Sequence, residues 1–413
     1  MTTVSRLPKH LKSTLPALLA ILALPLADAA AQAPPPAAPA APAAAPPALP
    51  PPVPLRQAFE KAAGDVLKNA AVPAGTRVDL LIDPLIDGNT GAQSSATRSL
   101  EAQLRQLIGK QFSDKFAVQP FSAENVAKNP YLFIGTFTPI HATAQAAGPK
   151  DAYRVCFAIL DLKTKQIVSK GFARATTAGI NAVPTPAYAD SPVWTKDPAV
   201  DGYIRTCQGT KVGDPINPNY VDKTSVAALI AEAIKAYDER RYGQALDLYT
   251  RARAQPGGAQ LRVLNGIYLS QLKLNRRADA SKALGELVDF GLKSEKLGMM
   301  MLFTRGSTAF APSAIARAYP DWIKAVAEKA QAGNACLQLV GHTSRTGTEP
   351  FNDRLSALRS AAIRQRMERL APALAKSLRS NGVGWRENIV GTGRDDASDA
   401  LDRRVEFKVV KCA

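Results

Sequence analysis

The chain has 413 residues, 46% of them hydrophobic, which is enough for two or three domains with packed cores. Its formal net charge is +17, and it contains 3 histidines. His141 and His342 are the histidines that follow the N-terminal segment, and they stand far apart in the sequence. This spacing argues against a histidine metal site and against a His-centred catalytic network, so we expect no metal and no cofactor.

The segment 1–29 has the layout of a secretory signal peptide. Arg6, Lys9 and Lys12 form a basic start, an apolar run spans 15–26, and Ala-x-Ala cleavage sites follow. A membrane anchor is the alternative, but this apolar run is shorter than the roughly 20 residues that a spanning helix needs. Cleavage after residue 29 would remove three cations and one anion and leave a net charge of +15.

Export limits what the positive charge of the chain can bind. An exported protein meets no genome, so we expect no nucleic-acid partner. Its anionic partners would be lipid head groups, lipopolysaccharide or cell-wall carboxylates, which leaves peripheral membrane contact open. A solvated basic surface without a specific partner is the alternative.

A Pro/Ala-rich linker over residues 30–54 leads into a predicted mixed α/β domain at 55–215. The spacing of apolar residues predicts helices at 55–71 and 99–110 and strands at 77–83, 116–118 and 131–136. Residues 153–161 and 166–175 flank a turn, which predicts a β-hairpin. Residues 184–219 are rich in Pro, Asp and Gly, so we expect a long loop or linker there.

This domain resembles the CsgG/LpoB-type envelope fold, which occurs in curli secretion and in activators of penicillin-binding proteins. The resemblance rests on a strand that ends at Asp83, a helix that carries Arg98, a strand that ends in Ile134-Gly135-Thr136, and the hairpin sequence at 160–165. It covers about 100 residues and includes no sharp motif.

Residues 222–292 predict helices with an internal repeat. Small residues, an aromatic residue and a proline stand in the order Ala233, Ala236, Ala245, Tyr249, Ala252 and Pro256. The positions of Ala233, Ala236 and Ala245 recur at one constant spacing as Gly266, Leu269 and Ala278. Small residues allow two helices to cross closely, while an aromatic ring fills the gap above them. The pattern resembles tetratricopeptide repeats, whose period of about 34 residues is close to this spacing. The resemblance implies a groove for other envelope proteins, and a helical spacer is the alternative.

Residues 297–411 predict the order β-α-β-α-β-β, so the whole chain is expected to be multidomain α+β. The predicted elements are a strand at 297–303, a helix at 313–331, a strand at 336–340, a helix from about Asn352, a strand and loop at 388–393, and a strand at 403–410.

These residues resemble the OmpA-like peptidoglycan-binding domain over about 114 residues. The family signature is Gly-His-Thr-Asp, then two residues and Gly, then Asn-x-x-Leu-Ser-x-x-Arg, a Gly-x-Gly loop and Asn-Arg-Arg-Val-Glu. This chain has Gly341-His342-Thr343-Ser344, Gly347, Asn352-Asp353-Arg354-Leu355-Ser356-Ala357-Leu358-Arg359, Gly391-Thr392-Gly393 and Asp402-Arg403-Arg404-Val405-Glu406.

The resemblance implies a site for the diaminopimelate end of the wall peptide, which carries an ammonium and a carboxylate. Arg359 would bind the carboxylate, but Ser344 stands where the family has the Asp that binds the ammonium. Exchanging a charged hydrogen bond for a neutral one weakens binding by about 1–2 kcal/mol, or roughly 5- to 30-fold, unless Asp353 or Glu349 compensates. The other implied ligand-binding residues are Thr343, Gly347, Asn352, Arg403 and Arg404. Asn352 is equally explained as a helix cap, and the two arginines as partners of local acids.

The four cysteines predict two disulfide bonds, because an exported chain meets an oxidising compartment. Sequence proximity favours the pairs Cys156–Cys207 and Cys336–Cys412. Four free buried thiols are the alternative. No Cys-x-x-Cys spacing indicates a redox motif or a zinc site.

Together, these patterns predict a non-catalytic protein of the Gram-negative periplasm, associated with the cell wall or the outer membrane. It would bind peptidoglycan through residues 297–411 and use its other domains for protein interaction. The alternative is a periplasmic scaffold whose C-terminal domain has lost wall binding. This alternative is suggested by Ser344, which stands where the family has an acid. A hydrolase built on Ser344 and His342 is not expected, since residues two apart do not form a nucleophile–base pair without an unusual turn.

Overall fold

The computed structural model describes residues 50–128, 130–142, 150–194, 196–391, 393–395 and 397–412. The predicted signal peptide and most of the predicted linker lie outside these residues. Across the described part of the chain, no helix combines the length and the apolar character that crossing a bilayer requires. The division into domains predicted from the sequence stays a prediction.

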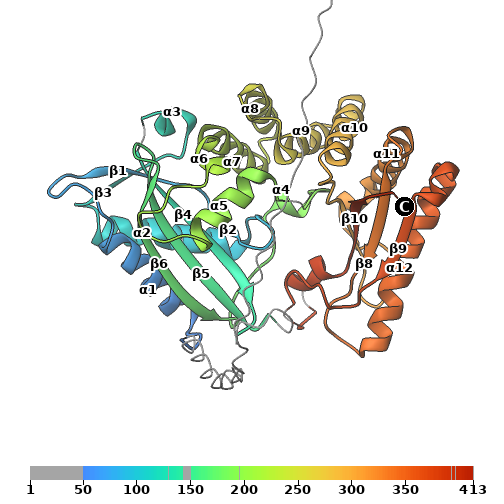
Figure 1. Ribbon diagram of the computed structural model, residues 1–413, viewed down its shortest axis with the longest axis horizontal. Coiled ribbons are helices and arrows are strands. Elements are labelled where there is room, and N and C mark those ends of the chain that lie inside the picture. Colours follow the sequence, from blue (N-terminus) through green and yellow to red (C-terminus); the bar gives the residue numbers. More distant parts are fainter. Residues whose placement is uncertain are drawn as a thin grey trace, which may run out of the picture. The chain divides into compact units, whose positions relative to one another are not determined.

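A six-stranded mixed sheet dominates the N-terminal part of the described chain (Figure 1). Its strand order is β3-β1-β4-β5-β6, and the short β2 pairs with β4. The first strands pair in parallel, whereas β4, β5 and β6 form an antiparallel meander. The elements are α1 (Leu55–Lys68), β1 (Val78–Ile82), β2 (Ile86–Asp87), α2 (Ser95–Gln111), β3 (Phe116–Gln119), α3 (Ala123–Val126), β4 (Tyr131–Ile140), β5 (Ala152–Asp161) and β6 (Gln166–Thr176).

Alternating side chains of the central strands bury both faces of this sheet. On one face, Phe133 and Phe157 pack with Phe59 of α1 and with apolar residues of α2. On the other face, Leu132 and Ala158 pack with residues from the helices that follow the sheet. The mixed α/β prediction is therefore confirmed, while the resemblance to the CsgG/LpoB-type fold stays a prediction.

The prediction of a long loop at 184–219 was wrong. The segment contains α4 (Pro186–Ala189), α5 (Pro198–Gln208) and α6 (Pro218–Val221), each with Pro in its first turn. Proline has no amide hydrogen, and the first turn of a helix needs none, so proline begins these helices and does not interrupt them. Asp197 also caps α5 by accepting from the backbone nitrogens of Ala199 and Val200.

Four helices follow, as the sequence predicts: α7 (Thr224–Asp238), α8 (Tyr242–Ala254), α9 (Leu261–Lys273) and α10 (Arg277–Lys293). A Cβ on Gly266 would lie 2.2 Å from the ring of Tyr249, so this small residue lets α9 approach α8 closely. Family membership in the tetratricopeptide repeats, and any protein partner of these helices, stay predictions.

The C-terminal sheet has four strands in the order β7-β10-β8-β9. Strand β10 pairs antiparallel with β7 and β8, and β9 pairs parallel with β8. The elements are β7 (Met300–Leu302), η1 (Ile315–Ala318), α11 (Tyr319–Ala332), β8 (Cys336–Gly341), α12 (Glu349–Leu370), η2 (Pro372–Lys376), β9 (Leu378–Gly382), η3 (Ser398–Asp402) and β10 (Arg404–Val410). The predicted β-α-β-α-β-β order is confirmed, but the third strand lies at 378–382, and residues 388–391 of the predicted strand and loop form a loop without a strand.

The helical segment and the C-terminal domain share one apolar core. Leu284 and Val288 of α10 belong to the same buried cluster as Trp322 of α11 and Phe407 of β10. Trp322 Nε1 also donates to Tyr268 Oη at 2.7 Å. A pair of helical repeats, as the sequence predicts here, would bury too little surface to stand alone, and the shared core buries the apolar faces of these helices.

Both predicted disulfide bonds are present. Cys156 of β5 is bonded to Cys207 of α5, and Cys336 of β8 is bonded to Cys412 near the end of the chain. The first bond links the N-terminal sheet to the helix that covers it. The second fixes the residues after β10 to the start of β8, so each bond closes one of the two sheet-containing regions.

Candidate ligand-binding site

Two glycines allow α12 to lie close against the C-terminal sheet. Gly341 at the end of β8 is paired with Gly382 of β9. A Cβ on Gly341 would lie 1.9 Å from the backbone oxygen of Ser356, and one on Gly382 would lie 2.3 Å from the backbone nitrogen of Ala357. Both distances are far below van der Waals contact, so a larger residue at either position would displace the helix. The close approach brings Arg359, about one turn further along α12, to the end of β8.

The side chain of Arg359 is fully buried and donates to three backbone oxygens. Nε donates to Ser307 at 2.9 Å, Nη1 to His342 at 2.9 Å and Nη2 to Thr304 at 2.8 Å. Burial and the nearby charge of Arg403 lower the pKa of Arg359 to about 10, so the side chain stays charged at neutral pH. These bonds fasten the loop after β7 to α12 and β8, and they leave two of the five N–H groups of the guanidinium for other partners.

A pocket of about 200 Å³ lies over this arrangement. Its wall includes six of the seven ligand-binding residues predicted from the sequence: Thr343, Ser344, Gly347, Asn352, Arg359 and Arg403. The loop after β7, the loop after β8 and the first turns of α12 complete the wall with Arg305, Gly306, Thr346, Phe351 and Leu355. Residues from widely separated parts of the chain thus meet at one cavity.

One wall residue has a buried hydroxyl group without a partner. Thr343 is 2% exposed, and its Oγ1 has no hydrogen-bond partner among the described residues. Leaving a buried polar group unpaired costs about 1–3 kcal/mol, so such groups are rare and call for an explanation. At the wall of a pocket, a hydroxyl of this kind is available to a ligand.

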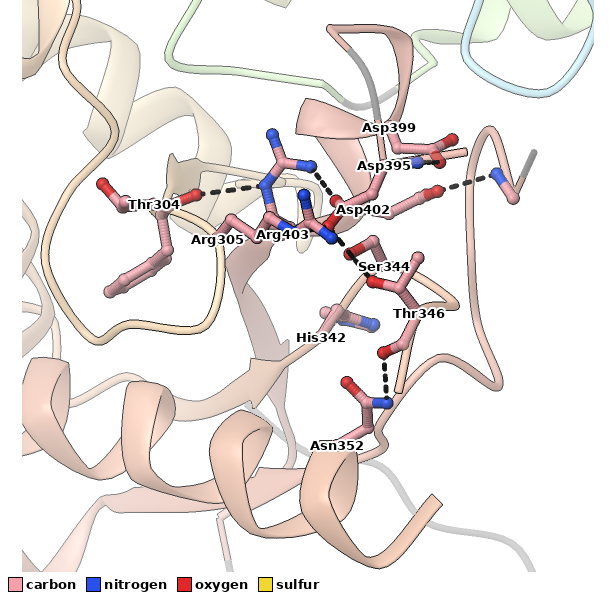
Figure 2. Close-up of polar contacts among 12 residues, drawn as sticks. Thr304, Arg305, His342, Ser344, Thr346, Asn352, Asp395, Asp399, Asp402 and Arg403 are labelled. Carbon is pink, nitrogen blue, oxygen red and sulfur yellow. Dashed lines mark hydrogen bonds and ion pairs between the residues drawn. The ribbon is translucent and has the colours of Figure 1, made fainter. Parts of the chain in front are cut away.

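Asp395, in the loop between β9 and η3, places a carboxylate against three residues of the pocket wall (Figure 2). Its Oδ2 accepts from Thr346 Oγ1 at 3.1 Å and lies 2.5 Å from Arg305 Nε. Its Oδ1 accepts from Arg403 Nη1 at 2.5 Å. The side chain of Asp395 exposes no surface to water, whereas that of Arg305 is 70% exposed.

The surroundings of Asp395 keep its carboxyl group ionised. Burial alone raises its pKa, but the hydrogen bond from Ser344, the charge of Arg403, the hydrogen bond from Thr346 and the charge of Arg305 together hold the pKa below its usual value. Ser344 is therefore in contact with an acid that comes from a different part of the chain. The pocket contains three arginines and this one carboxylate among its described residues and their contacts, so its net charge is positive.

Two further acids position the loop that carries Asp395. Asp402 accepts from the backbone nitrogens of Ile389, Val390 and Gly391 at 2.6, 3.0 and 2.7 Å. Asp399 accepts from the backbone nitrogen of Asp395 at 2.8 Å. Three amides on one carboxylate explain why 388–391 forms a loop and not the strand that the apolar residues predict. Burial raises the pKa of Asp402 to about 6, against the effects of these amides and of Arg404.

Three residues singled out from the sequence hold the fold around the pocket. Arg404 does not line the pocket and donates to Glu406 Oε1 at 2.6 Å and to the backbone oxygens of Leu401 and Glu387. Asn352 Nδ2 donates to the backbone oxygens of Thr346 and Thr348 at 2.8 and 3.0 Å. His342 is fully buried, and burial, Arg404 and Lys408 lower its pKa, so its ring is neutral.

Glu349 and Asp353, the acids considered as substitutes at position 344, lie elsewhere. Both form ion pairs with Arg386, at 2.9 and 2.7 Å, and neither lines the pocket. No hydrogen bond joins Ser344 and His342, since neither ring nitrogen of His342 has a hydrogen-bond partner among the described residues, and Nε2 lies 3.8 Å from Glu406 Oε2.

Sequence reasoning missed Arg305 and Asp395. Arg305 stands in a loop outside the family signature. Asp395 stands two residues after the Gly391-Thr392-Gly393 motif of the family signature. An acid so close to a signature motif was the one signal that could have indicated it.

No protein-family model and no curated protein sequence matches the chain. Among solved structures, the peptidoglycan-associated lipoprotein from Burkholderia pseudomallei is 21% identical, with 27% of this chain and 89% of that chain covered and a TM-score of 0.23. The OmpA-like domain of FopA1 from Francisella tularensis is 18% identical, with 28% and 75% covered and a TM-score of 0.22. The periplasmic domain of Helicobacter pylori MotB is 17% identical, with 28% and 75% covered and a TM-score of 0.23.

Proposed function

We propose that this chain is a non-catalytic protein of the bacterial periplasm that binds peptidoglycan through the pocket at the end of β8. The ligand group is the diaminopimelate end of the stem peptide, which carries an ammonium and a carboxylate on one carbon. The helical segment and the N-terminal domain serve protein interaction. The observation that carries the proposal is one pocket whose wall combines three arginines, an adjacent carboxylate and the unpartnered hydroxyl of Thr343.

The chemistry of the pocket suits such a zwitterion. A guanidinium group offers planar, paired N–H donors that match a carboxylate. In Arg403, Nε donates to the backbone oxygen of Phe303 and Nη1 donates to Asp395 Oδ1. The Arg305 side chain is 70% exposed, so a ligand can reach it from the solvent. The hydroxyl of Thr343 can donate to a carboxylate or accept from an ammonium.

Co-sedimentation of the chain without residues 1–29 with purified sacculi tests this proposal. The positive net charge will cause some retention by itself, so the comparison needs a variant of equal charge. Arg403→Gln removes one pocket cation, while Arg379→Gln removes an exposed cation from β9, outside the pocket. We expect Arg403→Gln to weaken retention at moderate salt and Arg379→Gln to leave it unchanged. Equal losses in both variants, or no retention of the natural chain even at low salt, would overturn the proposal.

A scaffold without wall binding is the second candidate, and the burial of Arg359 favours it. Three of the donors of Arg359 serve backbone oxygens of its own domain, so this arginine stabilises the loop after β7 whether or not a ligand is present. A scaffold of this kind would not be retained by sacculi at any salt concentration, while its helical segment would still bind a protein.

A further inference from the structure

We propose that Asp395 is the acid of this binding site and binds the ammonium group of the ligand in place of an acid at position 344. The inference rests on the proposed function and identifies the residue that distinguishes a zwitterion from a simple anion. It assigns to the loop between β9 and η3 a role that the sequence motifs do not contain.

The contacts of the pocket wall lead to this assignment. Four wall residues contact the Asp395 carboxylate: Ser344, Thr346, Arg305 and Arg403. Ser344 therefore has an acid as its neighbour. The negative charge thus lies next to position 344, directly behind wall residues that include two arginines.

Arg305 marks the place that the ligand ammonium would take. Its Nε is ion-paired with Asp395 Oδ2, the oxygen to which an ammonium nitrogen would donate a charged hydrogen bond. Because the Arg305 side chain is 70% exposed, water can solvate it when a ligand displaces it. Arg403 is 13% exposed and keeps the other carboxylate oxygen in place.

The loop holds Asp395 in position before any ligand arrives. Asp399 accepts from its backbone nitrogen, and Asp402 fixes the preceding loop through three amides. The backbone of Asp395 has φ of 57°, a left-handed conformation that Asp tolerates better than most residues. These contacts and this backbone conformation fix the position of the Asp395 carboxylate in the free protein.

The second, independent observation is the hydroxyl of Thr343. It is nearly fully buried, lines the same pocket and has no partner among the described residues. A ligand whose ammonium binds Asp395 and whose carboxylate binds Arg403 brings both signs of charge into this small cavity, where either group can pair with the hydroxyl.

The test is the affinity of the chain without residues 1–29 for two soluble peptides. One is the stem tripeptide N-acetyl-L-Ala-γ-D-Glu-meso-diaminopimelate, whose one free amine is that of the diaminopimelate end, and the other is the same peptide with this amine acetylated as well. We expect the natural chain to prefer the free amine. Asp395→Asn should weaken binding of the free peptide about 5- to 30-fold and leave the acetylated peptide nearly unchanged, because a neutral hydrogen bond replaces a charged one.

Two further variants exchange the position of the charge. Ser344→Asp alone should not raise the affinity for the peptide with the free amine. The new carboxylate and that of Asp395 would be in contact and repel each other, so one of them takes up a proton. Ser344→Asp combined with Asp395→Asn should restore the preference for the free amine. Asp353→Asn is the matched control, because it removes a nearby carboxylate that is paired with Arg386 outside the pocket.

The outcomes separate this inference from the proposed function. If the natural chain binds neither sacculi nor the free peptide, the proposed function fails, and the inference fails with it. If the natural chain binds but Asp395→Asn keeps its preference, or loses both peptides equally, the inference alone is overturned. Should Asp395→Asn not fold in a thermal unfolding scan, Ser344→Asp decides, since a gain of 5-fold or more would show that the acid was missing.

Discussion

The backbone oxygen of His342 accepts a hydrogen bond from Arg359 Nη1 at 2.9 Å, which joins the end of β8 to the middle of α12. The same guanidinium holds the oxygens of Thr304 and Ser307. A residue expected to bind the ligand is thus also one of the main polar links of its own domain. This double role changes how substitutions at Arg359 must be interpreted.

We predict that Arg359→Ala lowers the free energy of unfolding by at least about 3 kcal/mol, because three backbone oxygens lose their donor. Arg359→Lys keeps the charge but cannot reach three oxygens at once, so it should fall between the natural chain and Arg359→Ala. Denaturant unfolding measures both values. An Arg359→Ala variant as stable as the natural chain would contradict the structural role. Loss of wall binding in Arg359→Ala is therefore not by itself evidence for a ligand contact.

Thr343→Val is predicted to have opposite effects on stability and binding. Valine has the same shape, and it removes a buried hydroxyl that has no partner among the described residues. We expect the free energy of unfolding to rise by about 1 kcal/mol and the affinity for the stem tripeptide to fall. Thermal unfolding and peptide titration on the same sample check the pair of effects. A variant that is destabilised would show that the hydroxyl already has a partner in the free protein.

The bond between Cys336 and Cys412 is predicted to stabilise the C-terminal domain by about 2–4 kcal/mol, since it closes a loop with a sequence separation of 76 residues. Replacing both cysteines by serine should lower the denaturant midpoint of the domain by a corresponding amount. Reductant should lower the midpoint of the natural chain further than that of a variant without this bond. An unchanged midpoint in the double variant would contradict the prediction.

The stability of the N-terminal domain is predicted to depend on Asp83 between pH 4 and pH 7. Burial raises the pKa of Asp83 to about 7, against the hydrogen bond from Tyr220 Oη at 2.5 Å and the charge of Arg262. A raised pKa favours the protonated form in the folded state. The resulting contribution to the free energy of unfolding is complete below about pH 4, which is the pKa of Asp83 in the unfolded chain. It is lost as the pH rises through about 7, the pKa in the folded chain.

Asp83→Asn should remove this dependence, because an amide does not titrate. The difference in unfolding free energy between the natural chain and Asp83→Asn should therefore change between pH 4 and pH 7, by up to about 4 kcal/mol for a shift of three pKa units. Asp79→Asn, at an exposed position of β1, is the matched control. A constant difference across this range would show that Asp83 has an ordinary pKa in the folded protein.

The sequence predicted six residues of the pocket wall because they belong to short motifs whose spacing is read directly. Asp395 and Arg305 belong to irregular loops, where no periodicity or spacing indicates which side chains meet. The place of Asp395 depends on Asp402, which binds the amides of three residues well before it in the chain. Such a tertiary contact has no local signal.

The misplaced third strand has a similar cause. Residues 378–382 include Asn381 and Gly382, which are typical of turns, whereas Ile389 and Val390 are typical of strands. Gly382 belongs to strand β9 because it is paired with Gly341 of β8. At both positions α12 lies so close that no side chain fits, so glycine is required there. The requirement comes from a helix that stands earlier in the sequence, and it outweighs local preference.

The most direct test of the central claim is release of the chain, without residues 1–29, from purified sacculi by soluble meso-diaminopimelate. The competing amino acid carries the ammonium and the carboxylate that the pocket is proposed to bind, while sodium chloride of equal ionic strength tests charge alone. We predict release by diaminopimelate at concentrations where the salt releases little, and no release by its N,N′-diacetyl form. Equal release by salt and by diaminopimelate would contradict specific recognition and leave only the attraction of a basic protein to an anionic wall.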